Sequence, residues 1–366
     1  MKIVVVGGGI MGAGTAYHLA RKGADVVVVE RADPGRATSA GAGIICPWLR
    51  RDHDPAFYAL ACASAAYYAE LVPALAEDGE TELGYRKVGA LLLSVDPAVL
   101  DHAEALVHRR AETAPEIGTI ARLAPDAVQE LFPPVDRQLL ALHLSGAARL
   151  DGRLLAAALE RASARHGASW RRGHAELLVE RGRAVGIVAD GERIDADAVV
   201  ICAGAWAASL LAPFGVDLPL APQRGQIVHL RLPGVDTSAW PVLLPADSDH
   251  YLLAFDDSRV VAGATRETGS GFDHRVTAGG LHEVLGQALR VAPGLASATL
   301  LETRIGFRPM SLTGGPLLGA LPSIDGLFVG NGLGPSGLTL GPGSSRLLAD
   351  QALGEPPSPL ITPFQP

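Results

Sequence analysis

Hydrophobic residues near the start of the chain follow two different patterns. Ile3–Val6 is a short β-branched run of the kind found in buried parallel strands. Ile10–Lys22 is rich in alanine, leucine and methionine and predicts a helix, which Gly23 ends as a C-cap. Val26–Val29 predicts a second strand. The chain therefore opens with a strand–helix–strand unit of about 30 residues.

The pattern changes twice further along the chain. Long helical patterns cover Ala56–Ala76 and Pro97–Glu112. The elements predicted after Ala147 are a helix from Asp151 to about His166, strands at Glu176–Val179, Ala184–Val188 and Ala198–Cys202, strand-like alternation over residues 223–264, a strand at Leu327–Val329 and a helix near Leu338–Leu353. We therefore expect a discontinuous first domain (residues 1–47, 141–218 and 300–366) and a second, inserted domain (48–140 and 219–299).

Composition and charge narrow the class of protein. The 366 residues are 48% hydrophobic and 19% charged, which suits two joined domains with sizeable cores. A net charge of -8 lacks the basic character that nucleic-acid binding needs. Cys46, Cys62 and Cys202 form no metal-binding or disulfide spacing, so we expect a reduced, cytoplasmic setting. No leader and no apolar run of about 18 residues is recognised, so we expect no membrane span.

A glycine motif lies between the first predicted strand and helix. Gly7, Gly9 and Gly12 form a G-x-G-x-x-G sequence. The first permits a tight turn, the second lets the backbone approach a pyrophosphate, and the third lets helix and strand pack closely. Glu30 ends the second strand, where a carboxylate accepts hydrogen bonds from an unphosphorylated adenosine ribose. The motif predicts an adenine dinucleotide site but does not separate NAD from FAD.

Three further stretches resemble the D-amino-acid oxidase and glycine oxidase superfamily of flavoproteins. The segment 31–43 reads RADPGRATSAGAG, similar to the loop and Ser/Gly-rich stretch that lie against FAD in that family. Residues 203–206 read AGAW, similar to its A-G-x-W segment beside the flavin, and residues 330–342 resemble its C-terminal flavin loop and helix. The positions that match are Arg31, Ser39, Gly41, Gly43, Ala203, Gly204, Trp206, Gly332, Gly334, Ser336, Gly337, Leu338 and Thr339.

The resemblance implies a fold and a cofactor. The expected fold is α/β, with a Rossmann-like FAD-binding domain of the GR2 type and an inserted α+β substrate domain that contains an antiparallel sheet. The expected cofactor is non-covalent FAD. Sarcosine-oxidase relatives attach their flavin through a cysteine in the neighbourhood of residues 310–316, and this chain has no cysteine after Cys202. Many relatives have histidine where Asn331 stands, so the role of that side chain stays open.

The segment Arg304–Pro309 reads RIGFRP and resembles the R-x-G-x-R-P segment of D-amino-acid oxidases. The resemblance implies that Arg308 pairs with the substrate carboxylate, onto which a guanidinium forks with two parallel hydrogen bonds. Arg304 is interpreted as a partner in a structural ion pair. Tyr251 resembles the tyrosine that helps to hold the carboxylate, although its position also suits an ordinary strand residue. His250 and His53 are interpreted as surface or core residues.

These residues support a hypothesis of oxidative deamination. A small amino acid, either a D-amino acid or glycine-like, would give hydride to flavin N5, and the imine would hydrolyse to a keto acid. Dioxygen, giving hydrogen peroxide, or another acceptor would reoxidise the flavin. Such transfer needs orientation and a dry pocket, so no general base is assigned. A secondary amine substrate (sarcosine- or proline-like), a 2-hydroxy acid substrate and a non-catalytic flavin-carrying subunit remain alternatives, and the sequence indicates no oligomeric state.

Overall fold

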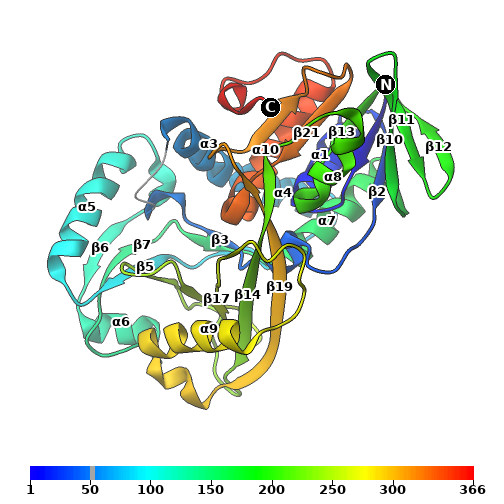
Figure 1. Cartoon of the computed structure of the whole chain (residues 1–366). Coiled ribbons are helices and arrows are strands. Elements are labelled where there is room, and N and C mark those ends of the chain that lie inside the picture. The colour runs from blue at the N-terminus through cyan, green and yellow to red at the C-terminus, as the bar shows by residue number, and fades with distance from the viewer. Residues whose placement is uncertain (50–53) are drawn as a thin grey trace.

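The computed structural model describes residues 1–49 and 54–366, so His53 lies outside the described residues (Figure 1). A mainly parallel sheet, called here the first sheet, forms the centre of the first domain. Its strand order is β20–β21–β13–β1–β2–β9, and β20 alone runs antiparallel to its described neighbour. The strands are β1 (Lys2–Val6), β2 (Asp25–Glu30), β9 (Ser169–Arg172), β13 (Ala198–Ile201), β20 (Leu317–Ala320) and β21 (Leu327–Asn331).

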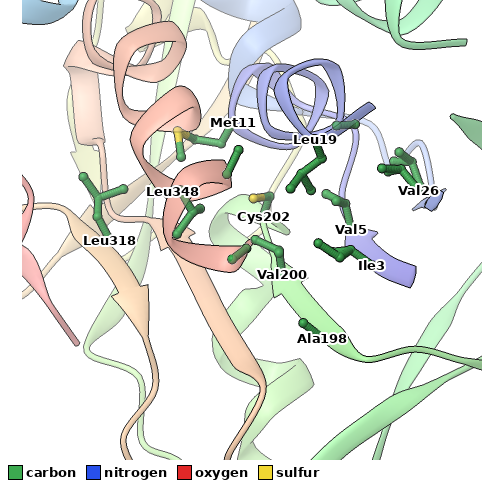
Figure 2. Packing of buried hydrophobic residues seen from close by; sticks show 14 of the residues in the cluster. Ile3, Val5, Met11, Leu19, Val26, Ala198, Val200, Cys202, Leu318 and Leu348 are labelled. Atoms are coloured by element: carbon green, nitrogen blue, oxygen red, sulfur yellow. The ribbon is translucent and has the colours of Figure 1, made fainter. Parts of the chain in front are cut away.

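The first sheet is covered on both faces, which explains its continuous runs of β-branched residues. Ile3 and Val5 face the helices α1 (Ile10–Arg21) and α10 (Gly337–Ala352), as Figure 2 shows. Val4 and Val6 face the opposite side, where they pack with the antiparallel strands β10 (Ala175–Glu180), β11 (Arg183–Ala189) and β12 (Glu192–Asp195) and the short helix α8 (Ala207–Leu211). The side chains of Ile3 to Val6 are therefore buried on both faces of the sheet.

A second, mostly antiparallel sheet forms the centre of the other domain. Its order is β18–β14–β17–β16–β15–β5–β7–β6, with β19 paired to β14. The strands are β5 (Ala90–Ser94), β6 (Ile120–Leu123), β7 (Leu140–Leu144), β14 (Leu220–Arg231), β15 (Val242–Pro245), β16 (Tyr251–Ala254), β17 (Arg259–Gly263), β18 (Glu267–Thr268) and β19 (Thr299–Ser311). Helix α5 (Pro97–Ala111) packs on one face, and α6 (Pro125–Leu131) and α9 (Ala278–Val291) pack on the other.

Two long strands join the domains. β14 and β19 pair antiparallel from Leu220 opposite Ser311 to Arg231 opposite Thr299, and in Figure 1 they run from the second sheet up to the first domain. Near the end of β19, Phe307 bridges to Arg36 and Met310 bridges to Leu333, both in the first domain. The carboxyl end of β19 therefore lies against both domains, and it carries Arg308 with it.

The predicted domain boundaries can be compared with the pairing and packing of the elements. The boundaries at 141 and 300 fall inside β7 and β19, and both strands hydrogen-bond within the second sheet. The helical pattern at 56–76 forms two helices, α3 (Pro55–Ala66) and α4 (Tyr68–Glu77), whose buried residues pack against α1, α10 and α7 (Gly152–Arg165) of the first domain. These helices therefore belong with the first domain, not with the inserted one.

The same pair of helices bears on the membrane question. The stretch Pro55–Glu77 spans 23 residues and is long and apolar enough to cross a membrane by length and composition. In the fold Leu60, Leu71 and Leu75 are fully buried, and they pack against the first domain. These three leucines of the stretch thus contribute to the protein core.

Candidate functional site

A cavity of about 830 Å³ lies where the two domains meet. The turn after β1 and the end of β2 line it from the first domain, and β14, β16 and β19 line it from the second. The sequence-predicted residues that line it are Gly7, Gly9, Glu30, Arg31, Gly41, Gly43, Ala203, Gly204, Trp206, Tyr251, Arg308, Gly334, Ser336, Gly337, Leu338 and Thr339. Residues far apart in the sequence thus share one space.

Gly7 and Gly12 of the glycine motif lie where a Cβ would overlap backbone atoms. Gly7 has a φ of 105°, and a Cβ there would overlap the carbonyl oxygen of Cys202. A Cβ at Gly12 would overlap the carbonyl oxygen of Gly7, so Gly12 serves the packing of helix on strand and does not line the cavity. The first turn of α1 contains no acidic side chain. The N–H groups of this turn other than that of Ile10, which donates to Thr38, therefore favour an anion such as a pyrophosphate.

Glu30 is fixed at the cavity wall by backbone donors. The N–H of Gly8 donates to Oε2, and the N–H of Ala32 donates to Oε1 at 2.5 Å. The guanidinium of Arg36 lies 3.7 Å from Oε1. Arg31 also lines the cavity, and its Nε donates to Asp33 at 2.6 Å. The carboxylate is thus held in a defined orientation at the end of β2, where a ribose would meet it.

The loop after β2 places Thr38, not Ser39, at the cavity. Thr38 lines the cavity, and its Oγ1 accepts a hydrogen bond from the N–H of Ile10 at 3.0 Å. Ser39 is absent from the described lining, and its carbonyl accepts from Arg153 Nε at 2.8 Å. The short helix α2 (Ala37–Ala40) sets which of the two hydroxyl residues faces inward. Sequence reasoning located this stretch but chose the adjacent residue.

Asn331 ties two of the flavin-type loops together. Its Nδ2 donates to the carbonyl of Gly204 at 2.9 Å, and its Oδ1 accepts from the N–H of Gly332 at 2.9 Å. Gly332 itself does not line the cavity, whereas Asn331 does. The side chain whose role the sequence left open therefore joins the end of β21 to the turn after β13.

The amino-terminal end of α10 lies at the cavity. Gly334 to Thr339 line it, and they form the turn that leads into this helix of 16 residues. Tyr68 donates to the carbonyl of Leu338 at 2.5 Å, and Thr339 Oγ1 donates to the carbonyl of Ile44 at 3.0 Å. Because the amino-terminal end of a helix carries partial positive charge, it stabilises negative charge on a group bound there.

Arg308 is held in the cavity by neutral oxygen atoms. Its Nη1 donates to the carbonyl of Thr265 at 2.9 Å and to Oε1 of Gln223 at 3.3 Å. Among the described residues no carboxylate forms an ion pair with it, since Glu267 binds Arg224 and Gln226 instead. Burial lowers the pKa of Arg308, because removal from water disfavours the charged form. An anionic ligand would compensate this charge.

Tyr251 lies beside Arg308, and glycines make room for both. Burial raises the pKa of the Tyr251 hydroxyl, although the charge of Arg308 opposes the shift. A Cβ at Gly225 would lie 2.6 Å from Arg308 Nη2, and one at Gly263 would lie 2.5 Å from the Tyr251 hydroxyl. Arg304 does not line the cavity, and it pairs with Glu302 at 2.6 Å.

Sequence reasoning missed several parts of the lining, including His250, which lines the cavity. Residues 173–177, which follow β9 and include the start of β10, line the cavity but carry no motif that marks them. Arg266 and Asp249 also line it and form an ion pair at 3.1 Å. The family resemblance did not include Arg266. The sequence around Arg266 shows only that this residue follows a buried strand.

The residues described here fit FAD. A dinucleotide turn, a fixed ribose-type carboxylate and a helix amino terminus line one cavity, together with an arginine that can bind a substrate anion. Trp206 also lines it and stacks on Phe272 with ring centroids 5.1 Å apart. The cavity thus combines two regions. The cofactor region is lined by the glycine motif, Glu30 and the start of α10, and the substrate region is lined by Tyr251, Arg308, Arg266 and Asp249.

Comparisons with known proteins agree with this geometry. The chain is 51% identical to iminodiacetate oxidase of a Chelativorans species, with a TM-score of 0.96 over 100% of this chain and 98% of that one. It is 46% identical to an uncharacterized oxidoreductase, YurR, of Bacillus subtilis over 99% of this chain and 98% of YurR. It is 32% identical to glycine oxidase of Pseudomonas putida over 100% of this chain and 98% of the relative. The family described as "DAO: FAD dependent oxidoreductase" matches residues 2–351. The chain therefore belongs to the DAO family of FAD-dependent oxidoreductases.

Proposed function

We propose that this chain catalyses the FAD-dependent oxidation of a small amino acid at the bond between its α-carbon and nitrogen. The observation that carries the proposal is the half-buried guanidinium of Arg308. Its hydrogen-bond partners among the described residues are neutral, and it shares a cavity with the dinucleotide motif. A carboxylate on the substrate compensates this charge and receives two parallel hydrogen bonds.

The chain's own side chains orient the substrate. Arg308 binds the carboxylate, and Tyr251, whose raised pKa keeps it protonated, donates a further hydrogen bond. Arg308 and Arg266 together place positive charge at the cavity and favour the neutral form of a nearby amine. FAD bound in this cavity would supply the acceptor for a hydride from the α-carbon. Orientation and exclusion of water supply much of the rate enhancement in such a site.

Two classes of substrate are proposed. Primary amino acids, namely glycine and D-amino acids, are supported by the likeness to glycine oxidase. Secondary amines such as iminodiacetate are supported by the 51% identity and TM-score of 0.96 with iminodiacetate oxidase. The same Arg308 geometry serves both, since each carries a carboxylate on the carbon beside the nitrogen. We propose dioxygen as the acceptor, because both of these relatives are named oxidases.

Anaerobic reduction of the bound flavin tests the proposal. The purified holoenzyme is mixed without oxygen with glycine, sarcosine, iminodiacetate, D-alanine, L-proline and D-lactate in turn, and the loss of flavin absorbance is followed. We expect at least one amine to bleach the flavin, and admitting air to restore the colour with formation of hydrogen peroxide. Bleaching by lactate alone would assign a hydroxy-acid enzyme. A yellow protein that none of these compounds reduces would support a non-catalytic flavin carrier.

A further inference from the structure

A second arginine lies in the substrate region of the cavity. Arg266 follows Thr265, the residue whose carbonyl accepts a hydrogen bond from Arg308, and both arginines line the cavity. The charge of Arg266 contributes to lowering the pKa of Arg308 and acts in the same direction on Tyr251. The two guanidinium groups therefore interact unfavourably across the same small region.

The carboxylate that pairs with Arg266 is well exposed. Asp249 Oδ2 lies 3.1 Å from Arg266 Nε, and the Asp249 side chain is 75% exposed whereas that of Arg266 is 38% exposed. Exposed ion pairs contribute little to stability, so a ligand carboxylate can replace Asp249 at little cost. His250, the next residue, is directed to another partner, Glu283, at 3.2 Å. The substrate region thus holds two cations and a single, readily displaced anion from the described lining.

We propose that Arg266 determines specificity by binding the second carboxylate of a dicarboxylic amine while Arg308 binds the first. Asp249 then acts as an internal competitor that holds Arg266 until such a substrate arrives. The inference rests on the proposed function, because it takes Arg308 as the site of the first carboxylate. A dianion satisfies both guanidinium groups and relieves their mutual repulsion, whereas a monocarboxylate compensates one of them.

Binding of unreactive carboxylates to the holoenzyme tests the inference without turnover. Malonate, succinate and glutarate are titrated against acetate and propionate, and the change in the flavin absorption spectrum gives each dissociation constant. We expect at least one dicarboxylate to bind more tightly than either monocarboxylate. Arg266→Gln should then weaken that dicarboxylate by about 10- to 100-fold, the range expected for a lost charged hydrogen bond. Asp249→Asn should strengthen the same dicarboxylate, because it removes the internal competitor.

A matched control is available on helix α9, in an arginine that pairs with the turn carrying Asp249. Arg290 pairs with Asp247 at 3.0 Å, is 47% exposed and does not line the cavity. Arg290→Gln should therefore leave the ratio of dicarboxylate to monocarboxylate affinity unchanged. In turnover, Arg266→Gln should lower the ratio of kcat/KM for a dicarboxylic secondary amine to that for sarcosine by about 10- to 100-fold, mainly through KM.

The results separate this inference from the proposed function. If Arg308→Gln weakens every carboxylate while Arg266→Gln changes both classes equally or neither, the inference is overturned and the proposed function stands. Equal affinity of the wild-type protein for both classes also overturns it. If no carboxylate perturbs the flavin and no amine reduces it, the proposed function fails and the inference fails with it.

Discussion

The guanidinium of Arg308 donates to one carbonyl and one amide oxygen, which leaves its charge available to a ligand. Arg308→Lys keeps the charge but cannot fork onto a carboxylate. We expect kcat/KM to fall by about 10- to 100-fold, as for a lost charged hydrogen bond, with the flavin content unchanged. Steady-state peroxide formation measures this. Arg304→Lys is the control, since Arg304 pairs with Glu302 outside the cavity lining. An equal loss in both variants would contradict the assignment.

Gly225 leaves the space that the guanidinium of Arg308 occupies. A Cβ there would lie 2.6–2.7 Å from three atoms of the guanidinium, so Gly225→Ala must displace that group. We expect a rise in KM of about tenfold or more, because the displaced guanidinium loses much of a charged hydrogen bond to the substrate. Gly286→Ala on α9, where a Cβ has no atom within 4 Å, should leave KM unchanged. An unchanged KM in Gly225→Ala would show that the arginine relaxes without loss.

At the residue scale the sequence located much of the candidate site but not all of it. Arg308 and Tyr251 were predicted because a family segment marks them, and the structure places both at one cavity. Thr38 was missed because the inward position depends on the turn of α2, which the pattern of small residues does not fix. Arg266 was missed because a charged residue after a strand has no distinctive signal until the cavity around it is known.

Helix α1 carries a buried histidine that couples stability to pH. His18 is 7% exposed, and burial, with Arg346, Arg21 and Lys22, lowers its pKa to about 3. The unfolded chain takes up a proton below pH 6.5, whereas the folded chain does not until about pH 3. The free energy of unfolding therefore falls as the pH drops through this window, by at most about 1.4 kcal/mol per pH unit from this group.

His18→Gln should flatten this dependence while retaining a hydrogen-bond partner for Tyr67, whose hydroxyl lies 3.3 Å from Nε2. Urea unfolding between pH 4 and pH 7 measures the slope. His102→Gln, at an exposed position on α5, is the control and should leave the slope as it is in the wild type. Parallel curves for the wild type and His18→Gln would rule out this coupling.

Addition of a single carbon atom at Gly12, in the first turn of α1, should disturb cofactor binding. A Cβ at Gly12 would overlap the carbonyl oxygen of Gly7, so Gly12→Ala should open the dinucleotide turn. We expect the variant to be purified with much less flavin than the wild type, as absorbance per protein would show. Gly279→Ala on α9, where a Cβ meets no atom within 4 Å, should keep its full flavin content.

At the element scale, regular patterns were predicted well and interrupted ones poorly. β1, α1 and β2 have uniform runs bounded by glycine, and each was placed within a residue or two. β19 was not recognised as a strand, because Gly306 and Pro309 interrupt its pattern and its stability comes from pairing with β14 along its whole length. The strands β5 to β7 were hidden among helical patterns, since short apolar runs do not distinguish strand from helix.

Because both domains line the cavity, removal of the cofactor should lower the stability of the folded protein. Anything that binds the folded state alone stabilises it, by about 2.7 kcal/mol when the ligand is at 100 times its dissociation constant. We expect the deflavinated protein to unfold at a lower temperature and added FAD to restore the loss, as scanning calorimetry would show. FMN lacks the adenosine part that we expect Glu30 to bind, so added FMN should raise the unfolding temperature less than added FAD. Equal melting temperatures with and without FAD would contradict a shared site.

The continuous ladder of β14 and β19 also limits how this protein can acquire a new specificity. Arg308 lies near one end of that ladder, close to the cofactor region, while the other end belongs to the second sheet. The second domain therefore cannot be exchanged between relatives as an independent unit, because the junction would fall inside two paired strands and disrupt their hydrogen bonds. New preferences should arise instead by point changes at the cavity rim, and directed evolution would do best to begin at positions 249 and 266.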